Sequence, residues 1–414
     1  MANSEMRRNW PLLLVAFILV FFSFGIPTFS MPWMYPAAME EFGWSREQVN
    51  YLSTSKFLTG AVMAVVMGAL VDAIGARWIT IGAAAVGGLG MFMLKFADNL
   101  PVYYFAGFLI GISAGGVMAC MKVIVARVFE FNAAVAVGIV LSATSVAGVI
   151  MPQIWPPMIE WVGWRNTSAI LGLGVFIFAL PAWAVFLFSH KRLAEAVSTP
   201  NLVPRKEGMW AHFVRLQNDR NFWMIVIPVF LVSAVDQALM HNYVTFLRED
   251  RGLDWRAISW GGSLLALLGV VSKIGAGVIY DRFSIRGIVA FYFLLAISIW
   301  LALPVAGMAT LLLFIVIRGL AHGAMIVDVP ALTKHYFGPE RFGLTMGILT
   351  LFVNLGFAVG PPLMGRMADL TGSYESGMML YGFVALVAGL ILMPVKPRYW
   401  ARAKDKTTVE HANS

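Results

Sequence analysis

The chain has 414 residues, of which 59% are hydrophobic and 13% are charged, and its formal net charge is +8. Soluble domains carry roughly a quarter charged residues, so this composition excludes a soluble globular protein. The single cysteine, Cys120, excludes an intramolecular disulfide, and the scattered histidines show no metal-ligand spacing. We therefore expect no cofactor, no metal and no nucleic-acid partner, since no soluble segment is long enough to present a basic face.

Apolar runs long enough to cross a membrane follow one another along the chain, since one crossing helix needs about 20 residues. The first six are predicted at 10–36, 46–71, 78–96, 100–126, 133–159 and 166–188. Six more are predicted at 221–247, 256–280, 287–305, 307–333, 342–365 and 377–395. The first run extends beyond the length of a signal peptide without a clear cleavage site, so we expect an uncleaved helix. The sequence thus predicts an all-α polytopic membrane protein with twelve transmembrane helices.

This order of elements predicts two helical domains joined by a hydrophilic segment. We expect an N-terminal six-helix bundle at 1–189, a cytoplasmic linker at 190–220, a C-terminal six-helix bundle at 221–396 and a cytoplasmic tail at 397–414. Basic residues concentrate in alternate loops, among them Arg77 and Lys191, and the positive-inside rule places both termini in the cytoplasm. We expect a multi-pass protein of the plasma (inner) membrane that contacts the lipid bilayer and functions as a monomer.

Residues recur at a fixed offset of 209 positions. The first set, Gly68, Asp72 and Arg77, recurs as Gly277, Asp281 and Arg286, and the second set, Gly138, Pro152 and Gly163, recurs as Gly347, Pro361 and Gly372. Six matches at one offset indicate a parallel internal repeat of two six-helix units.

The segment from Gly68 to Arg77 reads GALVDAIGAR and resembles the GxLxDxxGxR motif of the major facilitator superfamily. This resemblance implies the major facilitator fold, with two pseudo-symmetric six-helix bundles. It also implies a gating motif formed by Gly68, Asp72 and Arg77, with a second copy at Gly277, Asp281 and Arg282. We expect Asp72 to pair with cations and to cap neighbouring helix ends. In the second copy, Ser284 stands where the motif prefers glycine.

Three further stretches resemble the branch of monocarboxylate transporters and oxalate/formate antiporters. They read EFGWSR at 41–46, YFGPE at 336–340 and DLTGSY at 369–374. The resemblance implies a secondary transporter of small organic anions that is coupled to protons or runs as an exchanger. It also places Lys273 at the position of the family's membrane-embedded basic residue. The lysine that the oxalate branch carries on the eleventh helix is missing, and Asn354 is the polar residue in the middle of that helix.

Ionisable residues within the predicted helices support an anionic substrate without reference to any family. Each such residue costs about 2.5 to 3.5 kcal/mol at the bilayer centre. Cations outnumber carboxylates among them, and a cavity with that balance favours an anion. The residues are Lys56, Lys122, Lys273, Arg318, Asp236 and Asp328.

The cations have two interpretations that the sequence leaves open. Lys273 either anchors a substrate carboxylate or pairs with an aspartate. Arg318 shares a helical face with His322 and either grips a carboxylate or pairs with Asp236 or Asp328. Lys56 joins the substrate site if it faces the cavity. Lys122, near a helix end, either joins them or extends its ammonium to the interface. Tyr35 and Tyr243 are candidates for the walls of the site.

Proton coupling is assigned to Asp236, with His241 nearby on the seventh helix. The alternative is that Asp236 is a permanently charged partner of Arg318 or Lys273. The expected function is alternating-access transport of a small organic anion, a monocarboxylate, with proton symport. Antiport or export of a larger amphipathic acid is the alternative within transport, and a non-transporting receptor or transceptor is the alternative from another class. No clustered nucleophile and base are visible, so we expect no enzyme.

Overall fold

The structure is a computed structural model that describes residues 2–129, 133–190, 209–338 and 342–399. Throughout these ranges the regular structure is helical and includes no strand. Contacts divide the chain into two units, Met1–Pro204 with His241–Ala266, and Arg205–Met240 with Leu267–Ser414. Two of the divisions, after Met240 and after Ala266, fall inside helices. The predicted division at 189, 220 and 396 remains a prediction.

In the first unit, the N-terminal helix is longer than predicted. It runs from Ala2 to Phe42 through a π-helical turn at Phe21–Gly25, and Gly43, which has φ of 65°, caps its C-terminal end. The helices are α1 (Ala2–Val20), α2 (Ile26–Phe42), α3 (Arg46–Ile74), α4 (Ala76–Met93), α5 (Leu100–Val128), α6 (Ala133–Gly174) and α7 (Leu180–Ser189).

In the second unit, the predicted linker contains a short helix, α9, in its described part. The prediction of a linker at 190–220 stays a prediction, since a linker can contain a helix. Apolar residues alternate with His212 and Arg215 at helical spacing over 209–216. The helices are α9 (Met209–Leu216), α10 (Arg220–Thr245), α11 (Trp255–Phe283), α12 (Ile285–Trp300), α13 (Met308–Met325), α14 (Asp328–Leu332), α15 (Phe342–Thr371) and α16 (Glu375–Leu392). Of these, α10 ends and α11 begins in the first unit.

Within the described residues, nine helical segments are long and apolar enough to cross a membrane. One of them, Val135–Ser189, spans two predicted helices, and Gly163 breaks it with φ of 77° and ψ of 161°. A further apolar helix, α12, is shorter, with 16 residues. Each predicted helical region is helical over most of its length, with turns or irregular backbone at 301–305, 326–327 and 393–395, while the number of twelve crossings remains a prediction.

The internal repeat is visible in the backbone as well as in the sequence. Six of the seven described residues with positive φ form pairs separated by 209 residues: Gly43 with Gly252, Gly75 with Ser284, and Gly163 with Gly372. Such conformations favour glycine because a Cβ atom is strained there. Ser284, with φ of 53°, is the one non-glycine residue of this kind in the described chain. The same chain reversals therefore recur at the predicted offset.

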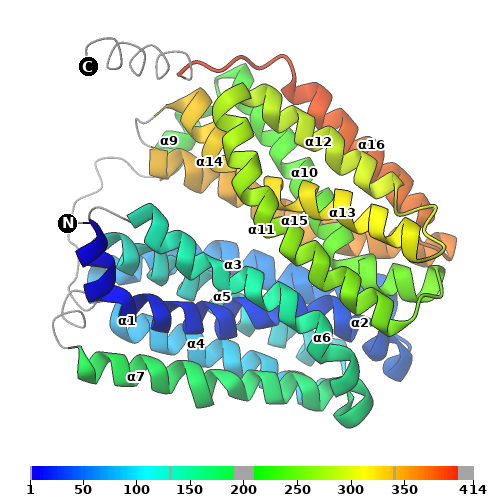
Figure 1. The fold of residues 1–414 in the computed structure, drawn as a ribbon, viewed down its shortest axis with the longest axis horizontal. Helices are drawn as coiled ribbons and strands as arrows, with labels where there is room; N and C mark the ends of the chain where they lie inside the picture. Colours follow the sequence, from blue (N-terminus) through cyan, green and yellow to red (C-terminus); the bar gives the residue numbers. More distant parts are fainter. Residues whose placement is uncertain (1, 130–132, 191–208, 339–341, 400–414) are drawn as a thin grey trace. The chain divides into compact units, whose positions relative to one another are not determined.

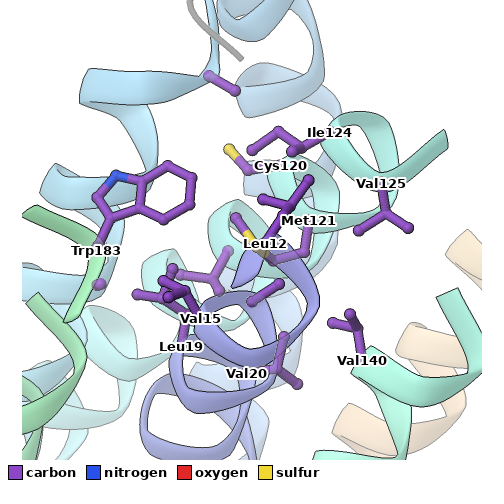
Figure 2. Packing of buried hydrophobic residues seen from close by; sticks show 14 of the residues in the cluster. Leu12, Val15, Leu19, Val20, Cys120, Met121, Ile124, Val125, Val140 and Trp183 are labelled. Atoms are coloured by element: carbon purple, nitrogen blue, oxygen red, sulfur yellow. The ribbon is translucent and has the colours of Figure 1, made fainter. Parts of the chain in front are cut away.

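The core of the first unit lies where α1, α4, α5 and α7 run side by side (Figure 1). Leu12 and Val15 of α1 belong to the same buried cluster as Cys120 and Met121 of α5 and Trp183 of α7 (Figure 2). These buried side chains fill the centre of the unit, so neither lipid nor water enters it. Close packing of this kind holds the helices rigidly against one another. In the second unit, α12 packs against both α13 and α16.

Close packing of α5 on α3 depends on glycines spaced four residues apart. A Cβ at Gly107 would lie 2.7 Å from the carbonyl oxygen of Leu52, and one at Gly111 would lie 2.5 Å from that of Lys56. Gly115 faces the carbonyl of Gly60 in the same way. Small residues at this spacing let two membrane helices approach closely. These contacts position the backbone of Lys56.

Candidate functional site

Lys56 lies in the interior of the first unit and is 1% exposed. Its Nζ donates a hydrogen bond of 2.6 Å to Oγ1 of Thr28, whose own hydroxyl donates to the carbonyl oxygen of Phe24. The ammonium also lies 4.6 Å from the ring centroid of Phe57 and 5.3 Å from that of Phe24. Such faces attract a cation through the ring quadrupole. No carboxylate among the described residues forms an ion pair with Lys56.

The predicted residues Tyr35 and His241 lie near this ammonium in the same unit. Tyr35 Oη lies 3.2 Å from His241 Nδ1, and their rings stack with centroids 6.0 Å apart. The imidazole also meets the ring of Phe57 edge to face, at 5.9 Å between centroids. Phe57 therefore contacts both the ammonium of Lys56 and the imidazole of His241. The structure brings three of the predicted site residues into one buried, mostly aromatic environment.

Tyr243, the other predicted wall residue, is 3% exposed and packs elsewhere in the first unit. Its ring meets Trp33 edge to face with centroids 6.3 Å apart. A Cβ at Gly262 of α11 would lie 2.7 Å from its hydroxyl oxygen. Tyr243 thus fits closely between α2 and α11, and its hydroxyl lies beside a helix backbone.

Polar contacts hold the end of α10 against α3 and so fix His241. Asn50 Nδ2 donates to Asn242 Oδ1 at 2.7 Å, and both residues are fully buried. Nearer the helix end, Arg46 Nη2 forms an ion pair with Glu249 Oε2 at 2.9 Å. Buried amide pairs of this kind tolerate little displacement, because an unpaired partner would cost free energy.

In the second unit, Asp236 is held by two side chains of α13. Arg318 Nη2 lies 2.8 Å from Asp236 Oδ1, and His322 Nδ1 lies 3.0 Å from Oδ2. All three residues are buried, with exposed fractions of 2% for Asp236, 1% for Arg318 and 9% for His322. Arg318 and His322 therefore share a face as predicted, and of the two readings of Arg318 the structure contains the pairing with Asp236.

Arg318 still has an unused donor group. Its Nη2 also donates to the backbone oxygen of Asp236 at 2.9 Å, whereas Nη1 is buried without a hydrogen-bond partner among the described residues. A buried unsatisfied donor costs roughly 1 to 3 kcal/mol, and more when it is charged. The second amino group is thus oriented to bind one further acceptor.

Lys273 is half-buried on α11, and the described ion pairs of Asp236 are those with Arg318 and His322. Next to it, Ser272 donates to the carbonyl of Leu320 and so joins α11 to α13. Gly269 lies on the side of α11 that meets α13, and Gly275 and Gly277 have open space where a Cβ would be. The side chain of Lys122 lies outside the described residues.

In the second copy of the gating motif, Asp281 lies beside two basic side chains. Asp281 Oδ1 lies 3.4 Å from Lys334 Nζ and 3.8 Å from His335 Nε2. Burial and the neighbouring ammonium of Lys334 lower the pKa of His335, while Asp281 opposes them. Ser284 Oγ lies 3.0 Å from Nδ1 of the same histidine. Arg282 stacks over the ring of Phe283 at 5.4 Å.

In the first copy of the motif, Arg77 lies over the ring of Trp78, with its guanidinium carbon 4.8 Å from the centroid. Gly68 has no side chain, and the side chain of Asp72 lies outside the described residues. The pairing expected for Asp72 therefore stays a prediction.

Sequence reasoning missed the contacts that individual polar residues make across the fold. Thr28 carries no motif, yet it is the hydrogen-bond acceptor for Lys56. His212 of α9 contacts Thr345 of α15, with Nε2 of the histidine 2.8 Å from Oγ1 of the threonine. On the other side of the ring, Arg215 Nη2 lies 2.6 Å from Nδ1 of His212. Because arginine can only donate, Nδ1 accepts and Nε2–H donates to Thr345, so this imidazole is neutral. The amphipathic pattern of residues 209–216 was the sequence feature that could have indicated the helix α9.

The sequence model of the Major Facilitator Superfamily matches residues 12–307 and 258–411, which together cover most of the chain. The chain belongs to the major facilitator superfamily. Monocarboxylate transporter 10 of Danio rerio is 23% identical over 348 residues, which cover 81% of this chain and 66% of that protein. This chain thus spans slightly less than two thirds of that relative.

One further relative and one solved structure are similar to the chain. Monocarboxylate transporter 2 of Homo sapiens is 21% identical over 409 residues, covering 93% of this chain and 84% of that protein. A crystal structure of a mutant of the nucleoside transporter NupG shares the fold, with a TM-score of 0.76 at 12% identity, and covers 92% of this chain and 99% of that one. The resemblance to this superfamily and to the monocarboxylate transporters is therefore confirmed, and the chain is a transporter-family membrane protein.

Proposed function

We propose that the chain carries a small organic anion, a monocarboxylate, together with a proton by alternating access. The proposal places it in the plasma membrane as a monomer with both termini in the cytoplasm. The observation that carries it is the buried ammonium of Lys56, whose described partners are one hydroxyl and two aromatic faces. The similarity to monocarboxylate transporters supports the same substrate class.

Lys56 is proposed as an anchor for the substrate carboxylate. Burying an ammonium costs several kcal/mol, and a hydroxyl with cation–π contacts offsets only part of that cost. A carboxylate would supply the missing countercharge. The aromatic rings of Phe24 and Phe57 would suit the short apolar part of a monocarboxylate better than a second carboxylate. Tyr35 is proposed as a neighbouring ligand, Tyr243 as a wall residue and Lys273 as a further cation.

Arg318 is proposed as the group that links anion binding to proton binding. Its free Nη1 offers donors to a carboxylate, and its Nη2 holds Asp236. A substrate that engages the guanidinium competes with Asp236 for it, and a proton then replaces the guanidinium as the partner of Asp236. Because binding couplings are reciprocal, the proton in turn favours substrate binding. His241 is proposed as the corresponding protonatable group of the first unit.

The function is tested with purified protein in liposomes and a panel of labelled monocarboxylates. We expect uptake of at least one acid to be faster with an inward proton gradient. Absence of flux for the whole panel would contradict transport of this class. Flux of larger amphipathic acids alone would favour the alternative of an exporter. Flux that needs an anion inside the liposome would favour the antiporter. Thermal stabilisation by an acid without flux would indicate a transceptor.

The anchor is tested by Lys56→Gln, with Lys95→Gln as the matched control because Lys95 is exposed. The first change is expected to raise KM at least tenfold, since the carboxylate loses a buried charge-assisted hydrogen bond of about 1.5 to 3 kcal/mol. The control should transport like the wild type. Equal KM values for both variants would remove Lys56 from the site.

A further inference from the structure

A second buried carboxylate, Asp328, lies at the start of α14 and is 3% exposed. Its Oδ2 accepts a hydrogen bond of 2.9 Å from the hydroxyl of Tyr292, and its Oδ1 accepts one of 2.6 Å from the backbone N–H of Val329. Both partners are neutral. Among the described residues, no lysine, arginine or histidine forms an ion pair with it.

Asp236 provides the contrast within the same unit. Its carboxylate is balanced by the guanidinium of Arg318 and contacted by His322, so the negative charge has a buried countercharge. Asp328 has two hydrogen-bond donors and no such countercharge. An ionised carboxylate in that situation is costly, and a buried group commonly relieves the cost by binding a proton.

Among the described residues, the ionisable groups that interact with Asp328 include no cation. Tyr292 from α12, Tyr280 from α11 and Asp236 from α10 interact with it electrostatically. On α13, Arg318 and His322 are engaged with Asp236, and beyond α14 Lys334 and His335 face Asp281. The part of α15 between residues 342 and 354 contains no ionisable side chain.

The helix that leads to Asp328 is interrupted just before this residue. A change in the charge of Asp328 would therefore act on a bend between two helices. The helix α13 ends at Met325, and α14 begins at Asp328 after a turn. Val327 N–H bonds to the carbonyl of Ala324, three residues back, instead of to that of Gly323. Interruptions of regular helical hydrogen bonding of this kind occur where helices bend or hinge.

We propose that Asp328, with Tyr292 as its hydrogen-bond partner, is a proton-binding site of the transport cycle distinct from the Asp236 group. The step is the addition of one proton to a carboxylate oxygen, which removes one buried negative charge at the interruption between α13 and α14. The inference rests on the proposed proton-coupled function for its role in transport. The protonation itself is a property of the protein alone.

Protonation is tested on purified protein by infrared titration, following the C=O stretching band of a protonated carboxyl group as pH is changed. We expect a titrating band that disappears in Asp328→Asn and persists in Asp236→Asn and in Glu160→Gln, a control at an exposed position. In Tyr292→Phe the midpoint should rise by about one pH unit, because the ionised form loses a donor. An unchanged band in Asp328→Asn, or an unchanged midpoint in Tyr292→Phe, overturns the site.

The role in transport is tested in liposomes. Asp328→Asn should still exchange labelled external acid for unlabelled internal acid, but an inward proton gradient should no longer accelerate its uptake. Wild-type acceleration in this variant overturns the coupling role. If no acid is transported by the wild type, the proposed function fails, while the infrared titration still decides whether Asp328 binds the proton.

Discussion

Arg318 holds Asp236 at two points with one nitrogen: its Nη2 lies 2.8 Å from the carboxylate oxygen Oδ1 and 2.9 Å from the backbone oxygen of the same residue. The guanidinium is therefore fixed relative to the backbone of α10 as well as to a side chain. This double contact leaves Nη1 in a defined orientation. A fixed donor is better suited to recognising a planar carboxylate than a freely rotating one.

Breaking this pair should destabilise the protein strongly. In Asp236→Asn the guanidinium of Arg318 loses its buried countercharge, and we expect a loss of about 3 kcal/mol in the free energy of unfolding. Thermal unfolding in detergent, compared with the exposed control Glu160→Gln, measures the effect. A wild-type melting temperature for Asp236→Asn would show that the pair does not stabilise the fold.

Lys273→Ala tests the cation that the family resemblance selected. If its ammonium binds the substrate, removing it should reduce kcat/KM for a monocarboxylate at least tenfold, the equivalent of one charge-assisted hydrogen bond. Liposome uptake under an inward proton gradient provides the measurement, with Lys95→Ala as control. Wild-type kinetics in Lys273→Ala would exclude Lys273 as a ligand and leave the substrate to Lys56 and Arg318.

Ser284 has a positive φ, as does Gly75 at the equivalent position of the repeat. Ser284→Gly and Ser284→Ala both lose the contact of Oγ with His335, so their difference reports the Cβ atom and the backbone strain that it causes, not that contact. We expect the glycine variant to be more stable than the alanine variant by about 1 to 2 kcal/mol. Equal stability of the two, measured by chemical or thermal unfolding, would contradict backbone strain at this residue.

Packing of α9 onto α15 should weaken at acid pH through His212. Burial, aided by the charge of Arg215, lowers the pKa of His212 in the folded protein. A histidine in the unfolded chain has a pKa of about 6.5. Below that pH the unfolded chain binds more protons than the folded protein, so the free energy of unfolding falls. Thermal unfolding between neutral pH and pH 5 should therefore decline less in His212→Gln than in the wild type. Parallel declines would argue against this role of His212.

The sequence predicted those features that depend on local pattern or repetition. Apolar runs marked the helical regions, and the offset of 209 residues led to Ser284 and Gly163, both of which have positive φ. It could not predict that Thr28 accepts from Lys56 or that Tyr292 donates to Asp328. These partners lie 28 and 36 residues apart on different helices, and no local spacing encodes such a contact.

The two readings of Arg318 show the same limit. Sequence spacing placed Arg318 and His322 on one face, but the choice of Asp236 over Asp328 as their partner depends on how α10 packs against α13. The continuous helix from α1 into α2 was also missed at its start. Polar residues there reduce the apolar signal, although the backbone remains helical.

The glycines of α5 that face α3 have a consequence for the placement of Lys56. Because Gly107, Gly111 and Gly115 contact the carbonyls of Leu52, Lys56 and Gly60, they set how deeply the whole of α3 sits in its unit. Adding a methyl group at Gly111 would displace the backbone that carries Lys56 while leaving its charge intact. The position of the Lys56 backbone is thus set by α5, while its charge is set by its own side chain, so the two can be altered independently.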